Sequence, residues 1–233
     1  MNRFAARTIT AALFAFAGAL PAFAQQKPSW PQVALTAHRD SFVIIVQGQQ
    51  RGSSVFTVHT KGDSAHIVEK TVMGTMGKQD SEIFTDLHGH LRSVTQASSF
   101  GGQQAMLNVA YQNGHAKGVS LSPGQPQPAQ VDAVVPGNAV DDNAFQALLP
   151  GLPWKPGAKW EFPVFSAQNN SVTSQTLTVE GVEKVTVPAG TFEAYKAVLQ
   201  AAVPVTFWVS QAAPHRVLKV APNGQPFSME LAN

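Results

Sequence analysis

The sequence lacks cysteine altogether and has few charged residues. Without cysteine there are no disulfides, no thiolate catalysis, no cysteine-bound metal and no lipid-carrying cysteine of a lipoprotein. Charged residues make up only 13% of the chain. No basic patch stands out among them, so nucleic acid is not expected as a partner. Because disulfides are excluded, the stability of the folded chain would have to come from packing.

The motifs of common enzyme classes are missing as well. The chain contains no G-x-S-x-G nucleophile elbow, no D-[ST]-G aspartic-protease loop, no P-loop and no dinucleotide-binding fingerprint. The two carboxylates of a glycosidase need not be close in sequence, so a hydrolase with dispersed catalytic groups stays open. The sequence thus indicates no catalytic residue, no ligand-binding residue and no cofactor.

Residues 1–24, at the N-terminus, have the pattern of an export signal. Two arginines provide a positive region, residues 9–20 are almost wholly apolar, and Ala22-Phe23-Ala24 forms a small-x-small cleavage site. We expect cleavage before Gln25 and a periplasmic or secreted mature protein. A membrane anchor is the alternative. The apolar run is shorter than the ~20 residues that span a bilayer, and no second such segment follows, so a membrane-spanning protein is not expected.

The remaining residues, 25–233, are interpreted as a single β-rich domain. Removing residues 1–24 takes away two basic residues and no acid, which leaves 14 of each and no formal net charge. Runs rich in Val, Ile, Phe and Thr alternate with turn residues, and Asn113-Gly114 is a strong hairpin signal. The Pro/Gln-rich stretch 122–130 is a loop or a sub-boundary. The expected strands cover residues 42–46, 55–58, 65–72, 82–87, 91–97, 106–111, 116–121, 131–135, 160–165, 172–187, 192–199, 203–210, 216–220 and 227–231.

This pattern predicts a mainly β fold: a curved antiparallel sheet, or an incomplete barrel, of about a dozen strands with one short helix. The helix is expected over residues 141–149, before Pro150. Asp141 or Asp142 would cap its N-terminus, which explains these acids more simply than weak calcium binding. The strand 172–187 is either one long strand or a hairpin bent near Gly181.

The C-terminal half carries a specific pattern. Residues 185–192 read V-T-V-P-A-G-T-F, residues 207–210 read F-W-V-S, and residues 214–220 read P-H-R-V-L-K-V; the turn W-K-P-G lies upstream at 154–157. The pattern resembles the C-terminal part of an uncharacterised family of exported bacterial β-rich domains, over roughly residues 140–233. The resemblance implies a curved sheet like that of periplasmic lipoprotein-carrier proteins, which cradle an apolar ligand. It implies no activity and no site residues. The V-P-A-G-T-F turn itself requires a positive φ at Gly190.

His88-Gly89-His90, with Asp86 nearby, is the one weak candidate for a metal site, since it offers two imidazoles and a carboxylate. A polar hairpin turn is the simpler interpretation, because a catalytic zinc would need a further ligand and supporting hydrogen bonds. The sequence therefore indicates no metal.

Three functions stay open. The first is a non-catalytic binding or carrier module of the cell envelope for an apolar or glycan ligand, such as a lipid. This hypothesis depends on the export signal and on the apolar cavity that a curved sheet often leaves. The second is a structural accessory whose sheet edges pair with an envelope protein. The third is the dispersed hydrolase, so an enzyme remains possible but is not favoured.

Overall fold

A computed structural model describes residue 31 and residues 33–233 of the protein. The predicted signal peptide and its cleavage site lie outside the described residues. Strands dominate the described part, and their bounds are β1 (His38–Val46), β2 (Gln49–Lys61), β3 (Ser64–Val72), β4 (Gly77–Asp86), β5 (Leu91–Phe100), β6 (Gln103–Gln112), β7 (His115–Leu121), β8 (Ala129–Val134), β9 (Val140–Asp141), β10 (Lys159–Ser166), β11 (Ser171–Val187), β12 (Gly190–Gln200), β13 (Val205–Ser210), β14 (Val217–Pro222) and β15 (Phe227–Leu231).

Strict alternation of side chains explains why these segments are strands with one buried face. In β4, for example, Ser81, Ile83 and Thr85 are buried, whereas Glu82 and Phe84 between them are exposed. Successive side chains of a strand point to opposite faces, so this alternation buries one face and leaves the other in water.

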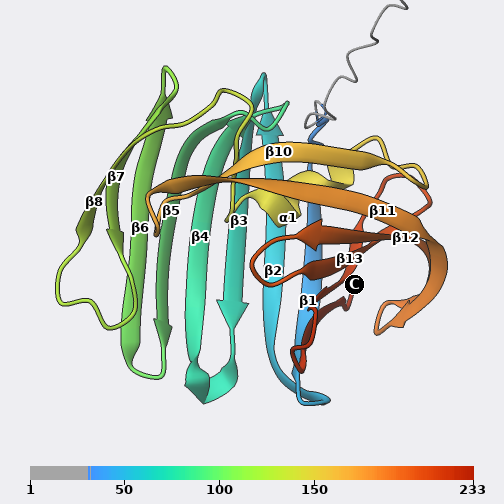
Figure 1. Cartoon of the computed structure of the whole chain (residues 1–233). Coiled ribbons are helices and arrows are strands. Elements are labelled where there is room, and N and C mark those ends of the chain that lie inside the picture. Colours follow the sequence, from blue (N-terminus) through green and yellow to red (C-terminus); the bar gives the residue numbers. More distant parts are fainter. Residues whose placement is uncertain (1–30, 32) are drawn as a thin grey trace, which may run out of the picture.

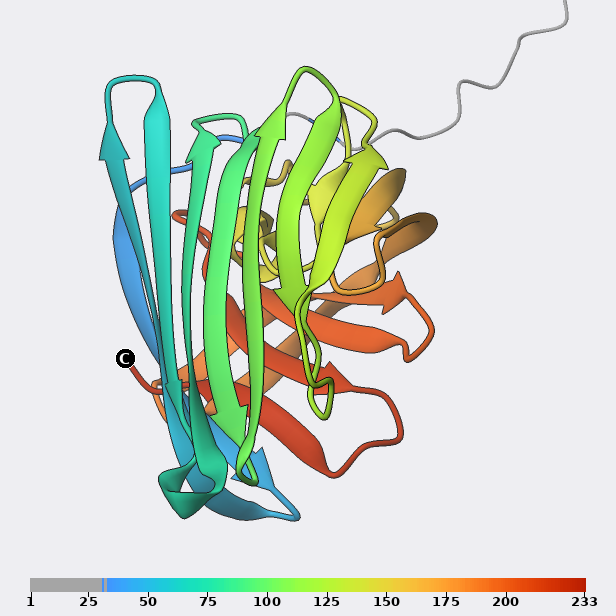
Figure 2. The ribbon, with the colours of Figure 1, turned by 90° about the vertical axis from the view of Figure 1, so that its left-hand side faces the viewer.

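All fifteen strands form one sheet, in the order β8-β7-β6-β5-β4-β3-β2-β1-β15-β14-β13-β12-β11-β10-β9. The neighbours are antiparallel except β9 and β10, which are parallel. The first and last strands meet in the middle of the sheet, where Phe42 pairs with Leu231. Strands β1–β8 form a first layer, and the sheet curls so that β10–β15 lie across it as a second layer (Figures 1 and 2). The predicted curved, open, mainly β fold is confirmed, with fifteen strands rather than about a dozen.

The two ends of the sheet, β8 and β9, are joined by residues 135–139, which we call the crossover. Tyr111 of β6 holds the ends together. Its hydroxyl donates a hydrogen bond to Asp141 Oδ2 of β9, and its ring meets the ring of Phe165 of β10 edge-on, with centroids 5.9 Å apart. Pro163 of β10 is compatible with a strand near a sheet edge, because proline has no N–H to donate to a neighbour.

Aromatic side chains fill the space between the layers. The short helix α1 (Phe145–Leu148) lies between them (Figure 1). The Phe145 ring stacks on Phe162, with centroids 5.6 Å apart, and contacts Phe207 at 5.5 Å. Trp154 stacks on Tyr195 at 5.8 Å and donates its indole N–H to the Leu149 carbonyl oxygen over 2.8 Å. The interior beside α1 is therefore closely packed.

The helix expected over 141–149 is much shorter than predicted. Residues Val140 and Asp141 form strand β9, paired with Val164 and Phe165 of β10, and α1 begins only at Phe145. The expected cap by Asp141 or Asp142 was wrong: the cap position is Ala144, without a side-chain hydrogen bond. A 3₁₀ turn, η2 (Leu149–Gly151), follows α1 and includes Pro150. Pairing with a distant strand outweighs the local helical pattern here.

The turns agree with the sequence-based predictions better than the helix does. Asn113 and Gly114 both have positive φ, 51° and 74°, in the two-residue turn between β6 and β7, as the hairpin signal predicts. Gly190 has the expected positive φ, at 135°. Strand β11 is one long strand with a bulge between Val179 and Gly181, not a hairpin. Among the residues described, no helix is long and apolar enough to cross a membrane.

Candidate functional site

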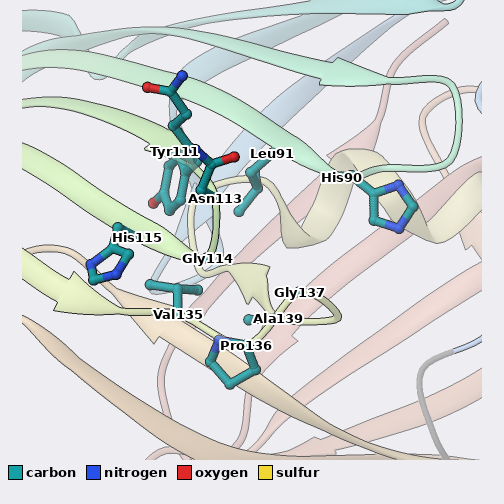
Figure 3. A pocket seen from close by; sticks show the side chains of 11 residues that line it. His90, Leu91, Tyr111, Asn113, Gly114, His115, Val135, Pro136, Gly137 and Ala139 are labelled. Atoms are coloured by element: carbon teal, nitrogen blue, oxygen red, sulfur yellow. The ribbon is translucent and has the colours of Figure 1, made fainter.

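Two adjoining hollows lie at one end of the long strands, where three connections meet. The first, of about 110 Å³, lies between His90–Leu91, Tyr111–His115 and the crossover. The second, of about 200 Å³, is lined by Pro31, His88–His90 and Asn138–Val140. They share His90 and Ala139, and we call the two together the rim groove. Figure 3 shows His90 and His115 on opposite sides of the first hollow, with Val135 and Pro136 between them at the edge.

Asp86 shapes the turn between β4 and β5. Its Oδ1 accepts the backbone N–H groups of His88 (2.8 Å) and His90 (3.0 Å), and its Oδ2 lies 2.7 Å from His90 Nδ1. Burial alone would raise the Asp86 pKa, but the hydrogen bonds from the His90 side chain and from the two backbone N–H groups hold that pKa below its usual value. Asp86 is thus engaged in fixing the direction of the turn.

Gly89 lets this turn sit directly on the interior. Its φ is +83°, and a Cβ there would lie 2.8 Å from Val33 Cγ2 and 3.1 Å from Leu148 Cδ2. Only glycine fits such a close approach without a shift of its neighbours. The turn is therefore packed against α1 and Val33 rather than projecting as a free tip.

The three weak metal candidates lie beside the rim groove, but their side chains do not converge on one point where an ion could bind. Asp86 and His90 form a hydrogen-bonded pair, whereas His88 Nδ1 lies 3.4 Å from the Val33 carbonyl oxygen. Across residues 33–233, no group of three or more His, Cys, Asp or Glu side chains is placed to hold a metal ion. The sequence-based prediction that the turn binds no metal stays a prediction.

An acidic cluster adjoins the groove, and Tyr111 connects the two. Asp141 is fully buried, and its Oδ1 accepts hydrogen bonds from the Asn143 backbone N–H (2.8 Å) and from Asn143 Nδ2 (2.9 Å). Burial raises the pKa of Asp141 despite these donors. Burial, and then the charge of Asp141, raise the pKa of the Tyr111 hydroxyl far above its usual value. Tyr111 therefore stays protonated and can only donate to the Asp141 carboxylate.

Asp142 is the acid of this cluster that reaches solvent. Desolvation by the surrounding protein, and next the neighbouring charge of Asp141, raise the pKa of Asp142 to about 7, although its residue surface is partly exposed. Asn143 Nδ2 donates to Asp142 Oδ1 over 2.8 Å. The pair of acids therefore takes up and releases a proton close to neutral pH.

Residues 34–232 match the family described as "Protein of unknown function (DUF3108)". The chain belongs to the DUF3108 family. The expected uncharacterised β-rich family is thereby confirmed, whereas the match does not test the V-P-A-G-T-F and W-V-S motifs. Among curated proteins, none matches the sequence.

One of the similar solved structures supports the fold of this DUF3108 chain, and the fold alone. A β-barrel-like protein of the DUF1849 family from Brucella abortus is 11% identical, with a TM-score of 0.52 over 85% of this chain and 96% of that one. A DUF1089 family protein from Pseudomonas aeruginosa (11% identical, TM-score 0.36, 74% and 90% covered) is more distant. So is a Bacteroides fragilis protein with a YmcC-like fold (10% identical, TM-score 0.29, 87% and 99% covered).

The rim groove of the DUF3108 chain combines polar and apolar lining. His90, Asn113, His115 and Asn138 can donate or accept hydrogen bonds, and Val135 with its neighbours offers apolar contact. Sequence reasoning singled out the His-Gly-His turn as a weak metal candidate and the Asn-Gly pair as a hairpin signal, and placed neither of them in a binding groove. It missed Tyr111 and the crossover, because nothing in their local sequence indicates that β6, β9 and β10 meet.

Proposed function

We propose that this DUF3108 protein is a non-catalytic binding module of the cell envelope, and that its rim groove takes a small hydroxyl-bearing ligand such as one sugar unit of an envelope glycan. The observation that carries the proposal is the pair of adjoining hollows, which places hydrogen-bonding side chains beside apolar ones. A sugar ring has hydroxyl groups at its edge and an apolar face, so it complements such a lining. The envelope location is supported by the export signal of residues 1–24.

A glycan unit suits the groove better than an acyl chain. The two hollows measure about 110 and 200 Å³, which is small beside the roughly 300–1,000 Å³ of typical ligand pockets. The interior around α1 is occupied by Phe145, Phe162 and Trp154. A carrier of the kind implied by the lipoprotein-carrier resemblance would need these side chains to move apart.

Gly137 offers a direct test. It lines the first hollow, and a Cβ at Gly137 would meet nothing within 4 Å. Gly137→Trp would therefore add a bulky side chain at the edge of the groove without a clash at its Cβ. Gly181→Trp is the matched control, because Gly181 also has open space and lies in the β11 bulge away from the groove. Saturation-transfer NMR of residues 25–233 with N-acetylglucosamine should give a signal that Gly137→Trp abolishes and Gly181→Trp keeps. Equal signals from both variants, or a signal with dodecanoate alone, would overturn the proposal.

One observation favours a hydrolase as the second candidate. Asp142 has a pKa of about 7, a value suited to a general acid or base, and lies two residues beyond Val140, which lines the groove. This candidate predicts that the protein releases new reducing ends from an envelope glycan and that Asp142→Asn stops this release. Binding without release in the wild-type protein would exclude it.

A further inference from the structure

The two faces of the first layer differ in the space that they leave open. A polar row of Glu69, Ser81 and Gln96 crosses the inner face, where Ser81 and Gln96 are buried and leave no room for a ligand. The outer face of β1–β3 instead holds a hollow of about 420 Å³, a volume within the roughly 300–1,000 Å³ of typical ligand pockets. We call it the outer hollow, and it is lined by Arg39, Val55, Thr57, His59, Val68 and Lys70.

The register of the strands places short side chains at the centre of the outer hollow and long ones around it. Thr57 of β2 lies between Arg39 of β1 and Val68 of β3. In the next row, Val55 of β2 lies opposite Lys70 of β3. Val55, Thr57 and Val68 are half-buried, whereas Arg39 and Lys70 are exposed. Three β-branched side chains therefore form a floor of methyl groups, with a long cationic side chain at each of two opposite corners.

These two cations have no counter-charge of their own. Neither Arg39 nor Lys70 forms an ion pair or a side-chain hydrogen bond with any of the described residues. Asp80 is the neighbour of Lys70 on β4, but their charged atoms are too far apart for an ion pair. Glu82, one row further along β4, is engaged by His66 Nε2 at 3.2 Å. The outer hollow therefore presents two uncompensated positive charges to the solvent.

Both cations can reach the same bound group. Arg39 and Lys70 lie two strands apart and are offset by two residues along the strand direction, which separates their Cα atoms by roughly 12 Å. The midpoint lies over β2, between Val55 and Thr57. An extended arginine or lysine side chain spans half of this separation, so a single anion above the floor would receive hydrogen bonds from both.

We propose that the outer hollow binds a carboxylic acid with a short hydrocarbon chain. The carboxylate would lie between Arg39, whose guanidinium group suits bidentate pairing with a carboxylate, and the ammonium group of Lys70. The chain would cover Val55 and Val68 and so remove their methyl groups from water. The proposal does not rest on the rim groove, with which the outer hollow shares no residue.

Hexanoate, acetate and 1-hexanol are the probes, because acetate has the charge without the chain and 1-hexanol has the chain without the charge. In NMR titrations of residues 25–233, hexanoate should give saturable shifts of the Thr57 and Val68 backbone amides. Acetate and 1-hexanol should each bind at least tenfold more weakly. Arg39→Gln and Lys70→Gln should each weaken hexanoate binding at least tenfold. Lys117→Gln is the matched control and should leave the binding unchanged, since Lys117 is an exposed lysine on β7.

Asp80→Asn should have the opposite effect and strengthen hexanoate binding, because it removes the negative charge beside Lys70. Arg39, Lys70 and Asp80 are all exposed, so each variant should keep the thermal melt of the wild-type protein. Equal affinity for hexanoate and acetate would show a non-specific anion contact only and overturn the proposal. So would the absence of a saturable shift, or hexanoate binding that Arg39→Gln and Lys70→Gln both leave unchanged. Loss of hexanoate binding in Gly137→Trp would place the acid in the rim groove instead.

Discussion

Tyr111→Phe tests whether one hydroxyl group holds the two ends of the open sheet together. The substitution removes the donor to the fully buried Asp141 Oδ2 and keeps the ring that contacts Phe165. No cavity is made beyond the lost oxygen, so the cost is that of a buried acceptor left without its donor. For a charged acceptor this is about 2 kcal/mol. In a domain of this size it corresponds to a fall in Tm of roughly 4–8 °C.

Tyr195→Phe is the matched control. Tyr195 is the only other tyrosine of the chain and is buried, with ring contacts to Trp154 and His215. Its hydroxyl group forms no hydrogen bond with any of the described residues. Its substitution should therefore change the free energy of unfolding little. Urea unfolding of both variants, and of Asp141→Asn alone and with Tyr111→Phe, gives the coupling energy directly.

The pH dependence adds a second check on the same bond. The Tyr111 hydroxyl favours ionised Asp141, so the difference between wild type and Tyr111→Phe should narrow as falling pH protonates Asp141. A loss below about 0.5 kcal/mol, the size usual for surface changes, or a loss equal to that of Tyr195→Phe, would refute the role of Tyr111 in closing the sheet.

Three further predictions concern other sites. Since the folded-state pKa of Asp142, about 7, lies above its ordinary 3.8, its contribution to stability is greatest below about pH 4 and is lost as the pH rises through 7; Asp142→Asn should flatten this slope in urea unfolding, and Asp132→Asn should keep it. Gly190→Val forces a β-branched residue to a φ of 135° and should destabilise by roughly 1–3 kcal/mol; an unchanged thermal melt would contradict the turn assignment. His88→Ala with His90→Ala should alter stability by about 0.5 kcal/mol or less; stoichiometric zinc, copper or nickel lost in this double variant would show a metal site instead.

The sequence predicts those parts of the fold that depend on near neighbours. Asn113-Gly114 fixes its hairpin because both residues tolerate positive φ, and alternation in β4 fixes which residues face inward. Asp141 shows why other parts could not be predicted. Its local sequence suits a helix start, but its hydrogen-bond partner is Tyr111, 30 positions away, and its strand partner is Phe165.

In the candidate sites, too, features set by near neighbours in sequence could be predicted, whereas features set by distant pairing could not. The turn of His88–His90 was visible in the sequence, but the crossover that completes the rim groove was not, because its position depends on where the sheet ends meet. The polar row of Glu69, Ser81 and Gln96 was equally hidden. A serine in an alternating strand is ordinary, and only the pairing of β3, β4 and β5 places these three residues side by side.

The pairing of β1 with β15 has a consequence for how the chain comes to fold. A nascent chain emerges N-terminus first, so β1 at first has only β2 beside it. Its other neighbour, β15, lies at the end of the sequence, and Phe42 cannot pair with Leu231 until β15 has emerged. Such distant pairing slows folding, because a long loop must close before the contact forms. The consecutive hairpins β1–β8 can assemble early, but their layer stays uncovered on one side until then. A chain ending before Phe227 would not lose a dispensable edge strand: it would lose the strand that joins the two halves of the sheet.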